Sequence, residues 1–101
     1  MDMETIQLIQ LIRQRPEIYI GVRSIWRLHA YIRGFLHAKT EGFTKMNGYT
    51  FNNDFTDWVT QKYYQNNHSW PFAVFIQSGF DETKALDIFF ELFDEYLATN
   101  N

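Results

Sequence analysis

The sequence predicts an all-α protein, a single-domain bundle of about five helices that spans residues 1–101. Three observations favour this fold class. The chain has 101 residues, of which 46% are apolar and 19% aromatic, which is enough for one hydrophobic core and too little for two. Apolar residues recur at the three- and four-residue spacings of amphipathic helices. Only two prolines and five glycines interrupt the chain.

The first helix is expected to occupy the start of the chain and to end at Pro16. Ile6, Ile9 and Ile12 recur on one face, while glutamine and arginine take the other. Residues 15–21 are apolar but bounded by proline and glycine. They are therefore expected to form an extended connector whose isoleucine and tyrosine side chains enter the core.

The second helix is expected from about Ile25 to about Thr40, with Ser24 as its N-cap and Gly42 as its stop. Its predicted buried stripe consists of Ile25, Leu28, Ile32, Phe35 and Leu36. Residues 43–50 contain an Asn-Gly turn signal. A loop is expected there, with a minimal hairpin as the alternative.

A third helix is expected from about Asn53 to Tyr64. Its apolar side consists of Phe51, Phe55, Trp58, Val59 and Tyr63. The segment Trp70–Phe80 suits either a buried helix with proline in its first turn or a buried strand. A helix is the better interpretation, because a strand would have no partner elsewhere in the chain.

The last segment, Asp81–Ala98, is the clearest helix, because its residues are good helix formers and its first two are acidic. Apolar residues cover most of its circumference, which is typical of a helix at the centre of a bundle. A narrow polar strip remains, formed by Asp87, Glu91, Asp94 and Glu95. This acidic edge is predicted to face solvent or a partner.

Charge is divided unevenly along the chain. Residues 1–45 hold seven basic and four acidic residues, a charge of +3, and residues 46–101 hold two basic and eight acidic residues, a charge of −6. A nucleic-acid-binding protein needs a clustered basic surface, so direct nucleic-acid binding is not expected. A basic protein partner fits the acidic edge better.

Composition also indicates where the protein works. The chain has no cysteine, which excludes disulfides and thiolate metal sites and suits the cytoplasm. Its first residues include acids where an export signal would be basic. No apolar run approaches the roughly 20 residues that cross a bilayer, so no membrane association is expected.

Catalysis, cofactors and metals are not expected. His29 and His37 share a helix face with Arg33, but two histidines two turns apart, with a cation between them, favour a solvated or partner-facing surface over a metal site. His68 has no acid nearby in sequence. The serines that could be nucleophiles are better interpreted as helix caps, namely Ser24, Ser69 and Ser78. The glycines are isolated, so no phosphate-binding loop is present.

The sequence carries two resemblances to known families. Arg-Pro-Glu-Ile-Tyr-Ile-Gly at residues 15–21 is similar to a short stretch near the start of type II topoisomerase ATPase domains, without that family's glycine-rich ATP lid or acidic Mg²⁺-binding helix. A wider pattern combines Arg15–Ile25, Leu28–Phe35, Phe55–Tyr63, the pair Ser69 and Trp70, and Ala85–Leu97. This pattern resembles small all-helical bacterial immunity proteins of contact-dependent growth inhibition and other polymorphic toxin systems.

That resemblance implies a cytoplasmic, non-catalytic inhibitor that binds one cognate secreted toxin. The toxin would be a nuclease, an RNase in preference to a DNase, and inhibition would cover its active site. Nucleases need basic surfaces to hold phosphate, so the acidic edge Asp87, Glu91, Asp94 and Glu95 is the predicted contact. Tyr49 and Tyr64, in or beside breaks between helices, are predicted anchors, and Trp70 is either an anchor or part of the core. The alternative function is a small helical adaptor or regulatory subunit.

Overall fold

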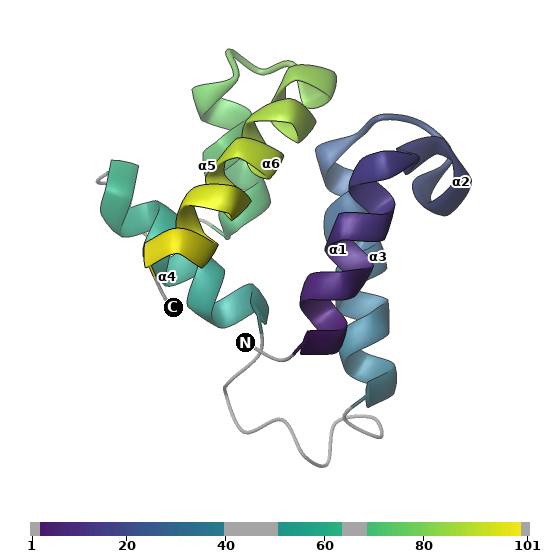
Figure 1. The fold of residues 1–101 in the computed structure, drawn as a ribbon. Helices are drawn as coiled ribbons and strands as arrows, with labels where there is room; N and C mark the ends of the chain where they lie inside the picture. Colours follow the sequence, from purple (N-terminus) through teal and green to yellow (C-terminus); the bar gives the residue numbers. More distant parts are fainter. Residues whose placement is uncertain (1–2, 40–50, 64–68, 100–101) are drawn as a thin grey trace.

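The computed structural model describes residues 3–39, 51–63 and 69–99 (Figure 1). These residues form six helices and no strand: α1 (Met3–Gln14), α2 (Pro16–Ile20), α3 (Ile25–Lys39), α4 (Phe51–Tyr63), α5 (Trp70–Gln77) and α6 (Glu82–Thr99). The predicted all-α single domain is confirmed. The five predicted helices are all present, and α2 is an additional short one. The predicted loop at 43–50 lies outside the described residues.

Helix α6 is central, as predicted. It packs against α3, α4 and α5, while α2 joins α1 to α3 (Figure 1). Phe89 and Phe93 on α6 are fully buried. The Phe89 ring lies 4.8 Å from that of Trp70 on α5 and 5.4 Å from that of Phe55 on α4, centroid to centroid. Trp70 is fully buried, so it belongs to the core and is not an anchor.

The expectation of an extended connector at residues 15–21 is wrong, because residues 16–20 form α2. Pro16 stands in the first turn, where its fixed φ favours a helix and its missing N–H costs nothing. Gly21 ends the helix at φ +85°, and its N–H donates to the Glu17 carbonyl at 3.1 Å. Proline here starts a helix as well as ending the one before it.

The turn from α5 to α6 is held by side-chain hydrogen bonds. The Asp81 carboxylate accepts from the backbone N–H groups of Thr83 and Lys84, both at 3.0 Å, and so caps α6. The Ser78 hydroxyl donates to the Phe75 carbonyl at 2.6 Å. Phe80, just before the cap, has φ +66°. This left-handed conformation is uncommon for a bulky side chain.

The start of α3 is fixed in a similar way. The Ser24 hydroxyl accepts a long hydrogen bond from the Arg27 N–H at 3.4 Å and donates to the Glu82 carboxylate at 2.9 Å. The predicted capping role of Ser24 is confirmed, and the same hydroxyl ties α3 to the first turn of α6. None of the helices in the described ranges is long and apolar enough to span a membrane.

Candidate functional site

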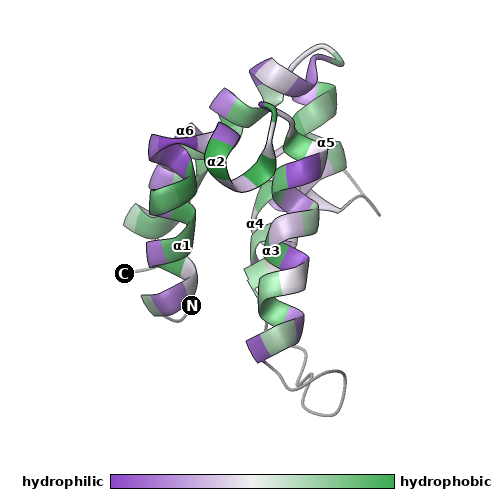
Figure 2. Ribbon diagram, turned by 90° about the vertical axis from the view of Figure 1, so that its right-hand side faces the viewer, coloured by the Kyte–Doolittle hydropathy of each residue, from purple (hydrophilic) through white to green (hydrophobic). Residues whose placement is uncertain are grey.

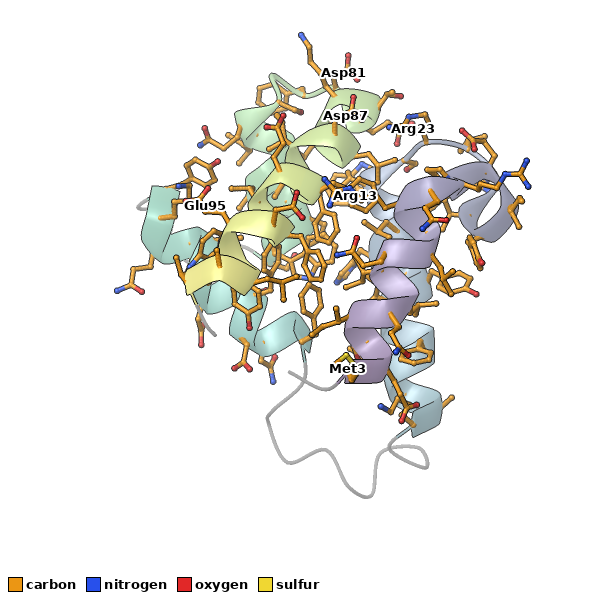
Figure 3. The ribbon with its side chains drawn as sticks, in the orientation of Figure 1. Met3, Arg13, Arg23, Asp81, Asp87 and Glu95 are labelled. Atoms are coloured by element: carbon orange, nitrogen blue, oxygen red, sulfur yellow. The ribbon has the colours of Figure 1, made fainter. Side chains whose placement is uncertain are left out.

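The four acids of the predicted edge all lie exposed along α6. Three of them pair with cations from other helices or from the loop before α3. Figure 3 shows Arg13 lying between α1 and α6, and Arg23 beside Asp87 at the upper end of α6. The exposed edge of α6 therefore also carries a row of ion pairs to α1, to α4 and to the loop before α3.

The best-defined pair joins Arg13 to Asp94. Two guanidinium nitrogens donate to the two carboxylate oxygens at 2.6 and 2.8 Å, the bidentate geometry that arginine favours. Arg13 also lies over the Phe90 ring, 5.4 Å from its centroid. The hydrogen bond from Arg13 lowers the pKa of the Asp94 carboxyl and raises the pKa of Arg13.

Two further pairs involve the ends of the edge. Arg23 donates to the Asp87 carboxylate. The Lys62 ammonium on α4 lies 2.6 Å from the Glu95 carboxylate, a hydrogen bond that raises the pKa of Lys62. A shallow hollow of about 240 Å³ opens beside this pair and is lined by Trp58, Gln61, Lys62, Glu95 and Thr99.

Pairing changes the electrostatics expected of the edge. The four acids carry −4 and the three cations beside them +3, which leaves −1. Glu91 alone of the four has no ion-pair partner among the described residues. Contact of the edge with a basic partner stays a prediction. The electrostatic attraction between the edge and a basic partner is weaker than four unpaired acids would produce.

Some of the other residues singled out in the sequence lie within the described ranges and some do not. Tyr49, Tyr64 and His68 lie outside the described residues. His29 is half-buried, with its ring 5.2 Å from that of Trp70. Burial, and secondly the charge of Arg33, lowers the pKa of His29. Across the part of the chain that the structure describes, no three histidine or acidic side chains are grouped as metal ligands would be.

One surface was missed by sequence reasoning. Trp26 on α3 and Phe72 on α5 are 37% and 41% exposed, and Phe80, in the turn after α5, is 68% exposed. The half-buried Phe75 joins them, because its ring lies 5.1 Å from that of Trp26 and 5.5 Å from that of Phe80. We call Trp26, Phe72, Phe75 and Phe80 the aromatic surface.

The composition of α5 explains why the surface exists. Its eight residues include a single polar side chain, Gln77, and in Figure 2 the helix is coloured mainly in hydrophobic green. A helix that is apolar all round is normally buried all round, yet the face of α5 that carries Phe72 is exposed. The sequence did carry a signal of this surface. A helix with apolar residues on every side has no polar face to turn to solvent.

No protein-family model, curated protein or solved structure matches the chain.

Proposed function

We propose that this protein is a non-catalytic binding protein of the immunity type, which neutralises a cognate toxin by forming a complex with it. The observation that carries the binding role is the aromatic surface, where Trp26, Phe72 and Phe80 remain exposed on a well-packed helical scaffold. Aromatic side chains are enriched at the centres of protein interfaces and supply most of their energetic anchors.

The geometry of the surface suits an anchor of this kind. Trp26 and Phe72 lie 6.2 Å apart, and Phe75 joins both Trp26 and Phe80. Rings held against one another lose little side-chain freedom on binding, so more of the contact energy is retained as affinity.

The toxin as partner comes from the sequence resemblance to immunity proteins. In this proposal the partner is a secreted nuclease, an RNase in preference to a DNase, and the inhibitor acts in the cytoplasm. Two surfaces are available to hold it, the aromatic surface and the acidic edge of α6. Because three acids of the edge are already paired, we assign the main anchoring role to the aromatic surface.

The test starts from the reading frame upstream of the gene. If it encodes a large secreted protein with a variable C-terminal domain, that domain is expressed in bacteria with and without this chain. We expect growth arrest without the chain, protection with it, and a stable complex of the two purified proteins. Arrest that this chain does not relieve, or an upstream frame of another kind, would contradict the toxin proposal and favour the adaptor alternative.

A further inference from the structure

We infer that His29 makes binding at the aromatic surface depend on pH, so that a protein partner is held at neutral pH and binds more weakly once the imidazole takes up a proton. This inference rests on the proposed function for the existence of a partner at that surface. Its basis is the place of His29 between the two helices that carry most of the rings.

His29 belongs to the same row of ring contacts as the aromatic surface. It lies three residues after Trp26, so the two side chains are neighbours on α3. The Trp26 ring lies 6.2 Å from that of Phe72 and 5.1 Å from that of Phe75, both on α5. The His29 ring lies 5.2 Å from that of Trp70, at the start of α5. Both contacts join α3 to α5.

Few charges act on His29. Helix α5, against which its ring packs, has no charged residue. Glu82 and Asp87 of α6 are engaged at the start of α3 and in the loop before it, more than one turn from His29. Burial, and secondly the charge of Arg33 one turn later, lowers the pKa of His29, and no carboxylate of the described residues acts on it. The free protein therefore favours the neutral imidazole.

A partner on the aromatic surface would strengthen this preference. The His29 ring is half-buried in the free protein, so it still has water to lose when the adjacent Trp26 is covered. Removing water from an imidazole disfavours its charged form and lowers its pKa further. The partner therefore binds the neutral form of His29 in preference to the protonated form.

The sign of the pH dependence follows from this preference. Above about pH 6.5, the ordinary pKa of histidine, His29 is neutral and the affinity is complete. As the pH falls through the pKa of His29 in the free folded chain, binding requires the loss of a proton and the affinity falls. A partner carboxylate placed against His29 would give the opposite sign, because it would stabilise the imidazolium.

The probe is a peptide without histidine, selected at about pH 7.5 from a random phage library against the immobilised full chain and no longer bound by Phe72→Asp. Proton NMR of the His29 Cε1–H group measures its pKa in the free chain and in the chain saturated with peptide. We expect a lower pKa in the complex. We also expect the dissociation constant to be about threefold or more higher at pH 5.5 than at pH 7.5.

Two variants keep a neutral side chain at this position. His29→Phe and His29→Gln should bind the peptide equally well at the two pH values, and the second tests the inference if the first does not fold. His37→Phe removes an exposed histidine two turns further along α3. It is the matched control and should retain the pH dependence of the unchanged chain. Circular dichroism shows whether each protein is folded at each pH.

Several results would overturn the inference. They are a pKa of His29 that is equal or higher in the complex, a pH dependence that both His29 variants retain, a loss of binding that coincides with unfolding, and a library that yields no peptide dependent on Phe72. A pH-dependent complex, together with a toxin that the chain does not neutralise, would leave this inference standing and remove the toxin proposal. Neutralisation of a toxin whose affinity at pH 5.5 is unchanged by His29→Phe would do the reverse.

Discussion

His29 shows how a single residue links the core to the pH of the solution. Its half-buried ring packs on Trp70, and burial lowers its pKa below the ordinary value. In the unfolded chain the imidazole takes up a proton below about pH 6.5. The contribution of His29 to stability is therefore complete above that pH and is lost as the pH falls through the folded-state pKa.

The free energy of unfolding should accordingly fall between about pH 7.5 and pH 5.5, the range in which histidine titrates. His29→Phe, which keeps an aromatic ring against Trp70, should reduce that fall. Urea denaturation of both proteins at the two pH values measures the effect. An identical pH dependence in the variant would show that His29 contributes nothing to it.

Removing the Phe80 ring is expected not to destabilise the protein, unlike most truncations of large apolar side chains. Phe80→Asn relieves a left-handed conformation and removes a mostly exposed ring, so the free energy of unfolding should stay level or rise by up to about 1 kcal/mol. Phe72→Asn, in the regular helix α5, relieves no such strain and should lower it. Denaturant titration distinguishes the two. A loss of more than about 1 kcal/mol in Phe80→Asn would show that the ring stabilises the fold.

At the scale of the element, α6 should dominate stability. Phe89→Ala and Phe93→Ala each empty a fully buried site and should cost about 3 to 5 kcal/mol. Leu11→Ala on α1, where half the side chain is exposed, is the matched control and should cost less than about 1 kcal/mol. If the phenylalanine variants lost as little as the control, α6 would be peripheral.

The ion pairs along α6 should contribute far less. Asp94→Asn breaks the bidentate pair with Arg13 at an exposed site, which should cost under about 1 kcal/mol. Because the pKa of Asp94 is lowered, this contribution is complete above about pH 4 and is lost as the pH falls through the folded-state pKa. Equal destabilisation at pH 7 and at about pH 2 would refute the electrostatic origin. Glu91→Gln, with no described ion pair, is the control.

Local sequence patterns predicted most of the helices but not the contacts that each helix makes with the others. Helical periodicity located α1, α3, α4 and α6 to within a few residues, whereas α2 was missed because proline was interpreted as a breaker and not as a first helical residue. The pairs Arg13–Asp94 and Arg23–Asp87 join residues 81 and 64 positions apart. Contacts at that separation depend on tertiary packing, which no local pattern encodes.

The same limit applies to the aromatic surface. Sequence reasoning identified α5 as a helix and assigned it to the core, because its apolar residues are indistinguishable by type. Which of them face outward depends on where α3 and α6 lie. The buried Trp70 and the exposed Phe72, two residues apart on one helix, show this directly.

For the molecule as a whole, the acidic edge predicts a partner with a basic surface. If the acidic edge docks on a basic nuclease, neutralising Asp87, Glu91, Asp94 and Glu95 to amides should slow association and remove most of its salt dependence, with little loss of stability. Stopped-flow mixing at several salt concentrations measures this. An unchanged association rate would mean that the edge serves only as a set of ion pairs within the molecule.

The indole groups of the three tryptophans test whether the aromatic surface is the binding site. Trp26 lies on that surface, Trp58 lies beside Glu95 in the hollow of the acidic edge, and Trp70 is fully buried. The measurement is the ¹H–¹⁵N spectrum of the three indole groups as the unlabelled toxin domain is added. We expect a large shift of the Trp26 signal, with the Trp58 and Trp70 signals nearly unmoved. A shift of the Trp58 signal with the Trp26 signal unmoved would show that the toxin binds at the acidic edge and not at the aromatic surface.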